Sequence, residues 1–185
     1  MAKLVFSGSL SPDKIKALSA YAQGLLTSAA EKAGIERVTV TSTIRTPRAQ
    51  AEAMYNNIAS GRFIRYASAG QKVTDLCLKM LGRKESREAT ISAMQELIEK
   101  LSEQGQRVSR HCVSREEYAK RNIVDVSQSL LYDKAAKFMK ELAATEAVEK
   151  IIQPIGGKIQ HDKISFDPSE PAIHIEISIP EKYRI

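Results

Sequence analysis

The chain has 185 residues, 43% of them hydrophobic and 27% charged, a composition typical of one globular domain that can bury an adequate core. The net charge of +6 favours anionic partners such as nucleic acid, anionic lipid or anionic cell-wall polymer, without selecting among them. The two cysteines, Cys77 and Cys112, are too few for a disulfide scaffold and fit a reducing compartment, and no segment has the ~20 apolar residues that span a bilayer.

The first quarter of the chain predicts a helix followed by a strand. Residues 1–14 lack the long apolar core of a signal peptide, so we expect the protein to be made in the cytoplasm. The run Ser-Pro-Asp at residues 11–13 is typical of a helix start, and apolar residues at helical spacing continue to Gly34, which ends the helix. Residues 37–43 alternate valine with threonine, as a strand does.

The middle of the chain is mostly helical in its pattern. Thr46-Pro47 opens a helix that runs to about Gly61, and residues 62–70 are expected to form a loop. Helices are predicted over residues 73–81 and 85–104, the second with a clear apolar face. We therefore expect a helical insertion at about 62–106 within one domain that spans residues 1–185.

The last third predicts a return to strands. Residues 122–127 form a short strand, residues 130–150 a helix, and residues 156–167 and 172–179 two antiparallel strands joined by the turn "DPSEP". The expected fold class is α+β, with several helices packed on a small, mostly antiparallel sheet.

Three residues on or beside these strands form a candidate metal site on the sheet face. Alternation in "AIHIEIS" places His174 opposite to its isoleucine neighbours, and Asp125 lies between two valines in "IVDVS". With His111, these residues offer two imidazoles and one carboxylate, which suit Zn²⁺ and leave a fourth position for water. Each residue taken alone is also typical of an exposed or hydrogen-bonded side chain, so the metal site depends on further features.

One such feature is the segment "TSTIRTPRAQAEAMYNNI", residues 41–58. It contains Ser42 at a strand end, Arg45 in a turn and Gln50 in the first turns of a helix. The segment resembles the Ser-x-x-Arg…Gln segment of zinc peptidases with a hedgehog-like metallopeptidase fold. These include D-alanyl-D-alanine carboxypeptidases, D-Ala-D-Ala dipeptidases and phage L-alanyl-D-glutamate endolysins.

The resemblance continues in the same order along the chain. In that family a Ser-x-His segment leads to an Asp on a strand, as Ser109 to His111 leads here to Asp125, and an acidic residue precedes a final His, as in "EPAIHIE" from Glu170 to Glu176. The resemblance implies that His111, Asp125 and His174 bind zinc. It also implies that Arg45 holds a substrate carboxylate or carbonyl oxygen. Gln50 and Ser109 would assist substrate binding, and each also fits an ordinary solvated residue.

The general base has three candidates. The resemblance favours Glu170, which would take a proton from the attacking water and pass it to the leaving amine. The final motif departs from the family pattern, because Ala-Ile stands where the family has Trp and Glu170 lies one residue further from His174. One step on a strand changes the face, so Glu176 or Asp167 remains an alternative base.

The loop between His111 and Asp125 also departs from the family pattern, and His161 and Cys112 are weaker candidates for the site. His111 and Asp125 are further apart than in the family, and residues 115–121, "REEYAKR", are interpreted as a charged insertion with a helical turn. His161 could be a ligand but fits an exposed strand residue better. Cys112 beside His111 fits an inert thiol better than a nucleophile.

The resemblance implies a zinc peptidase that cuts stem or cross-bridge peptides of bacterial peptidoglycan, such as a phage endolysin that acts on the cell wall after release through the membrane. The alternative is a catalytically inactive cell-wall-binding or virion structural module that retains the fold. The sequence has no zinc-finger spacing, base-reading basic helix or aromatic RNA-binding strand, so no nucleic-acid partner is expected.

Overall fold

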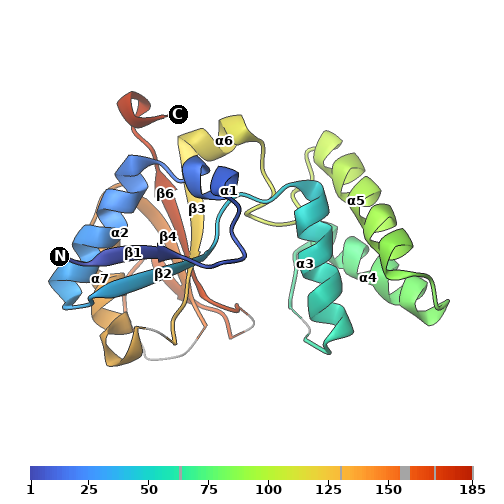
Figure 1. The fold of residues 1–185 in the computed structure, drawn as a ribbon, viewed down its shortest axis with the longest axis horizontal. Coiled ribbons are helices and arrows are strands. Elements are labelled where there is room, and N and C mark those ends of the chain that lie inside the picture. The colour runs from blue at the N-terminus through green and yellow to red at the C-terminus, as the bar shows by residue number, and fades with distance from the viewer. Residues whose placement is uncertain (63, 130, 155–158, 169, 185) are drawn as a thin grey trace. The chain divides into compact units, whose positions relative to one another are not determined.

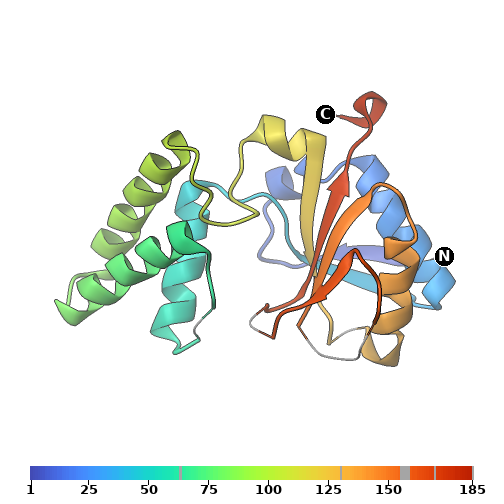
Figure 2. The ribbon, with the colours of Figure 1, turned by 180° about the vertical axis from the view of Figure 1, so that it is seen from behind.

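A computed structural model of the chain describes residues 1–62, 64–129, 131–154, 159–168 and 170–184. The chain divides into two compact units, one formed by residues 1–44 with 114–185 and the other by residues 45–113 (Figure 1 and Figure 2). The first unit contains a mixed sheet with helices and the second is helical, so the predicted α+β class is confirmed. Within the described ranges, no helix is long and apolar enough to cross a membrane.

The sheet of the first unit has six strands among the described residues, in the order β1-β2-β3-β6-β4-β5. The strands are β1 (Lys3–Phe6), β2 (Arg37–Ser42), β3 (Arg121–Val126), β4 (Val148–Gln153), β5 (Ile164–Phe166) and β6 (Ile173–Ser178). The pairs β2–β3, β3–β6 and β4–β6 are antiparallel, whereas β1–β2 and β4–β5 are parallel. The sheet therefore places β3 and β6, which carry Asp125 and His174, side by side at its centre.

The first predicted helix is interrupted near its middle. The structure has α1 (Pro12–Ala17) and α2 (Ala20–Ala33). Ser19 between them is extended, and its hydroxyl oxygen accepts from the backbone N–H of Ala22 as the N-cap of α2. The Ser19 backbone N–H donates to Asn122 Oδ1 at 2.8 Å, a bond to a distant strand that no local pattern reveals. Gly34 ends α2 at a φ of 73°, as predicted.

The helix predicted over residues 130–150 is wrong in its second half. The structure has a short 3-10 helix η1 (Tyr132–Lys134), then α7 (Ala135–Ala143), and then β4. "VEKIIQ" in β4 combines residues that favour a helix with residues that favour a strand, and its pairing with β6 decides the outcome. Because β4 was not predicted, the sequence also missed the strand that covers the outer side of β6.

The two final strands exist, but the predicted hairpin between them is wrong. β5 pairs with β4 in parallel, and β6 lies between β3 and β4. The described part of the first strand covers only Ile164–Phe166, and residues 156–158 of the prediction lie outside the described residues. Residue 169 of the predicted turn "DPSEP" lies outside the described residues, and in the sheet β4 separates β5 from β6.

One face of the sheet carries the main hydrophobic core. The side chains of Val124, Val126, Ile173, Ile175 and Ile177 are fully buried in a cluster that includes apolar residues of α2 and α7. Both helices lie along the same face of the sheet (Figure 1). Because side chains alternate between faces along a strand, the intervening polar residues of β3 and β6 lie on the opposite face.

The segment of residues 115–121 forms a helical turn, as interpreted from the sequence. Helix α6 (Arg115–Lys120) begins with a capping box between Ser114 and Glu117 and leads directly into β3. Tyr118 is 1% exposed, and its hydroxyl donates to the carbonyl oxygen of Ile123 at 2.9 Å. Helix α6 thus accommodates the extra residues between His111 and Asp125 and anchors them on β3.

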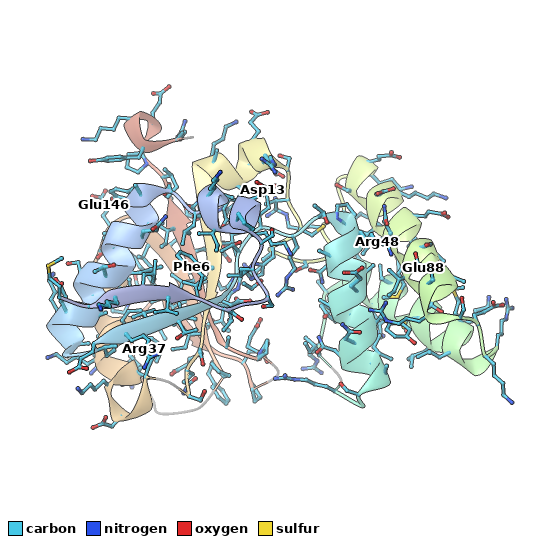
Figure 3. The ribbon with its side chains drawn as sticks, viewed as in Figure 1. Phe6, Asp13, Arg37, Arg48, Glu88 and Glu146 are labelled. Carbon is cyan, nitrogen blue, oxygen red and sulfur yellow. The ribbon has the colours of Figure 1, made fainter. Side chains whose placement is uncertain are left out.

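The second unit is formed by α3 (Pro47–Ala59), α4 (Ser68–Gly82) and α5 (Arg87–Glu103). These helices bury a separate cluster that includes Met54, Val73 and Met94. Arg48 of α3 forms an ion pair with Glu88 of α5 at 2.8 Å (Figure 3). The helical unit begins at residue 45 and includes α3, whereas the sequence placed a helical insertion at about 62–106.

Candidate metal centre

Asp125 and His174 are direct partners across the β3–β6 pair. Opposite residues of an antiparallel pair project from the same face of the sheet, with Cβ atoms about 5 Å apart. The Asp125 Oδ1 and His174 Nδ1 atoms are 3.1 Å apart, and both side chains are buried. On its other side, β3 has a register shift against β2 between Val40 and Ser42, so that Ser42 lies opposite Asp125. Such irregularities in sheets are common next to functional sites.

His111 lies in the loop between α5 and α6 and is 4% exposed. Its carbonyl oxygen accepts from the backbone N–H of Arg45 at 2.9 Å, and the Cys112 N–H donates to the Ser109 carbonyl oxygen to close a tight turn around it. The backbone on both sides of His111 is therefore held, which restricts the positions that its imidazole can adopt.

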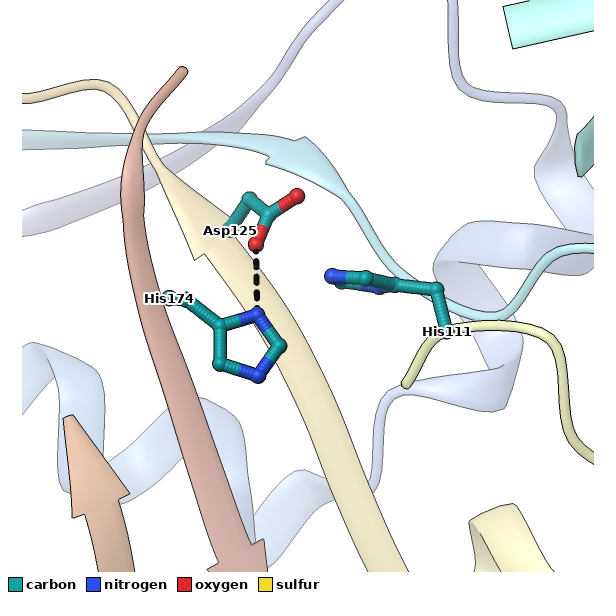
Figure 4. Close-up of side chains that lie close together, drawn as sticks. All are labelled: His111, Asp125 and His174. Carbon is teal, nitrogen blue, oxygen red and sulfur yellow. Dashed lines mark hydrogen bonds and ion pairs between the residues drawn. The ribbon is translucent and has the colours of Figure 1, made fainter. Parts of the chain in front are cut away.

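His111, Asp125 and His174 come together as the sequence predicted (Figure 4). Each offers one ligand atom, and these atoms all lie within 4.8 Å of one another. All three residues are buried, and two nitrogen donors with one carboxylate oxygen are a common ligand set for transition metals. The group can hold a metal ion.

The surroundings of His174 favour its charged form. Burial would lower the pKa of its imidazole, but the hydrogen bond with Asp125, the contact with Glu176 and the charges of Asp125 and Glu170 outweigh this effect and raise the pKa to about 9. This buried cluster of negative charge attracts a proton. For the same reason it attracts a metal cation, which would have to displace that proton.

Glu176 contacts His174 from the side of the ring opposite to Asp125. Its Oε1 atom lies 3.5 Å from His174 Nε2, and its Oε2 atom accepts from Arg121 at 3.3 Å. The same Arg121 nitrogen donates to Glu149 Oε2, also at 3.3 Å. Alternation along β6 put Glu176 on the same face as His174, but the contacts with Arg121 and Glu149 depend on strand pairing and were not predicted.

Arg45 and Gln50 are paired in the structure. Arg45 follows the end of β2, and its guanidinium donates to Gln50 Oε1 at 3.3 Å. Gln50 is fully buried in α3, so it is not the solvated helix residue that was one alternative. The backbone hydrogen bond between Arg45 and His111 brings the Arg45 segment beside the His111 loop.

The three candidate bases occupy different positions. Glu170 is half-buried, and its charge makes the smallest contribution to the raised pKa of His174, after those of Asp125 and Glu176. Asp167 is half-buried after β5, where its backbone N–H donates to the carbonyl oxygen of Gln153. Glu176 is 4% exposed and approaches the Nε2 edge of His174. Glu176 thus lies at the Nε2 edge of His174, whereas Asp125 lies at the Nδ1 edge.

Cys112 and His161 are the remaining candidates for the site. Burial outweighs the charge of Arg45 and raises the pKa of Cys112 to about 11, so this thiol is protonated at neutral pH, as expected of an inert cysteine. Cys77 is also a free thiol. His161 is half-buried and contacts Asp162 next to it at 2.7 Å, apart from the three clustered residues.

Comparisons of this chain with protein-family models, curated proteins and solved structures found no match.

Proposed function

We propose that this protein is a zinc-dependent peptidase that hydrolyses stem or cross-bridge peptides of bacterial peptidoglycan, the activity that phage endolysins of this kind perform. The observation that carries the proposal is the convergence of His111, Asp125 and His174 in one buried group. The motif order around Arg45, Ser109 and Glu170 in the sequence adds the peptidase assignment to the metal site.

The separation of the donor atoms supports zinc. Zinc binds nitrogen and oxygen ligands at about 2.0–2.2 Å in a tetrahedron, so two ligands of one ion lie about 3.3 Å apart. Asp125 Oδ1 and His174 Nδ1 are hydrogen-bonded at 3.1 Å, and all three ligand atoms lie within 4.8 Å of one another, so small shifts would bring them to one ion. A zinc ion held there acts as a Lewis acid that polarises a carbonyl group and activates water.

The protein side chains supply the other functions of a peptidase. The planar guanidinium of Arg45, steadied by Gln50, holds a carboxylate or carbonyl oxygen of the substrate. The Glu170 carboxylate takes a proton from the attacking water and delivers it to the amine nitrogen of the cleaved bond, so that one water is consumed for each carboxylate and amine released. Ser109, half-buried in the turn before His111, assists in substrate binding.

The test is hydrolysis of isolated peptidoglycan by the purified, zinc-loaded protein, measured by mass spectrometry of released peptides. We expect His174→Ala to abolish release and His161→Ala, which removes the histidine outside the group, to leave it unchanged. Continued hydrolysis by His174→Ala would refute the proposal. A wild-type protein that binds zinc and sediments with cell walls but cuts nothing would instead be a non-catalytic cell-wall-binding or virion structural module.

A further inference from the structure

The most unusual charged group on the site face of the sheet is Glu176. It is 4% exposed on the central strand β6, where a carboxylate without compensating partners would be strongly destabilising. Its two oxygens point in different directions, Oε1 toward His174 Nε2 and Oε2 toward the guanidinium of Arg121. This arrangement directs one oxygen of a buried carboxylate to a single nitrogen of a metal-binding histidine.

We propose that Glu176 is a positioning residue that selects which nitrogen of His174 is presented to the metal. With Glu176 accepting the Nε2–H, the proton that a metal ion displaces is the one that Nδ1 shares with Asp125, so that Nδ1 is the nitrogen left to bind the ion. The inference rests on the metal site of the proposed function and extends it to residues beyond the three ligands. Carboxylates that accept the second N–H of a metal-binding histidine orient the ring and raise its basicity.

The positions of the two ring nitrogens carry this assignment. Nδ1 faces the Asp125 carboxylate at 3.1 Å (Figure 4). The other ring nitrogen, Nε2, lies 3.5 Å from Glu176 Oε1. Once Nδ1 is committed to a cation, the remaining ring proton resides on Nε2, where the Glu176 oxygen faces it. The contact of 3.5 Å is long for a hydrogen bond, and such contacts commonly tighten when a site is occupied.

Arg121 keeps Glu176 in this orientation. Ile123 is the direct partner of Glu176 on β3, and Arg121 lies two residues earlier on the same face, within reach of the carboxylate. Its NH1 atom bridges Glu176 Oε2 and Glu149 Oε2, and Glu149 lies where the β4–β6 register shifts. The positive charge of Arg121 thus compensates for the buried carboxylate and leaves Oε1 available to His174.

The first test is zinc affinity, measured by competition with a chromophoric chelator. We expect Glu176→Leu to weaken zinc binding about 10- to 100-fold, the usual effect of losing such a partner. Glu176→Gln, which retains an oxygen acceptor, should lose less. The control Glu116→Gln changes an exposed glutamate that pairs with Lys120, and it should bind zinc within about twofold of the wild type. Thermal unfolding of each variant checks that it is folded. Wild-type affinity in a folded Glu176→Leu protein would overturn the inference.

The second test reads the tautomer directly and does not require a variant. Long-range ¹⁵N–¹H correlation spectra of the zinc-loaded wild type should show His174 bound through Nδ1 and protonated on Nε2. Metal on Nε2 would refute the role of Glu176, whatever the affinities show. Zinc binding with this tautomer but without peptide hydrolysis would support the inference and overturn the proposed peptidase. A wild type that binds no zinc would overturn both.

Discussion

If the His111–Asp125–His174 group binds zinc as proposed, the raised pKa of His174 should make zinc binding strongly dependent on pH. In protein without bound metal this imidazole has a pKa of about 9, so at pH 7 zinc must displace a proton from nearly every molecule. That competition lowers the apparent affinity at pH 7 by about 100-fold, or about 2.7 kcal/mol, relative to high pH. Between pH 6.5 and 8.5 the apparent affinity should therefore rise by on the order of 100-fold, whereas an imidazole of ordinary pKa would change it by about twofold.

The measurement is a chelator competition series across that range, corrected for protonation of the chelator. Calorimetry at pH 7 in two buffers of different ionisation enthalpy counts the protons released on zinc binding, and His174 should contribute about one. His161→Ala is the control and should give the same slope. A change of only twofold between pH 6.5 and 8.5 would show that Asp125 and Glu176 do not hold a proton on His174, and would refute the electrostatic account of the site.

Three further predictions concern stability. Because the folded-state pKa of His174 is raised, its contribution of about 3 kcal/mol to the metal-free protein should be complete below pH 6.5 and lost as the pH rises through 9, which denaturant unfolding at several pH values can measure. Gly70→Ala should destabilise the protein by roughly 1–3 kcal/mol, because the added Cβ would lie 2.9 Å from the carbonyl oxygen of Val108. Gly24→Ala, on an open helix surface, should stabilise the protein by about 0.5–1 kcal/mol. Equal shifts in the melting temperatures of the two variants would contradict the close packing at Gly70. Tyr118→Phe should lower the unfolding free energy by about 1 kcal/mol, since it removes a buried hydroxyl that donates to a carbonyl of β3, and an unchanged denaturation midpoint would exclude that bond as a stabilising contact.

Two of the three candidate ligands, Asp125 and His174, could be predicted because their signals are local. In β3 and β6 the alternation of valine or isoleucine with a polar residue assigns Asp125 and His174 to the face opposite the core, whatever strands lie beside them. His111 carries no such pattern and was found through its place in a motif order. The direct pairing of Asp125 with His174 is a matter of register between strands 49 positions apart in the sequence, and no local pattern encodes it.

The contacts of Glu176 and Glu149 with Arg121, beside the candidate ligand His174, could not be predicted, because they depend on the position of β4. If β5 and β6 formed a hairpin and residues 130–150 a helix, as the sequence suggested, Arg121 could still reach Glu176. Glu149 would then lie in the helix and could not form its ion pair with Arg121. In the structure β4 pairs with the free side of β6, which encloses Glu176 and brings Glu149 to Arg121. From the sequence alone, Glu176 is therefore a candidate base two residues after His174. Its burial and its contact with Arg121 can be recognised only once β4 is known to lie beside β6.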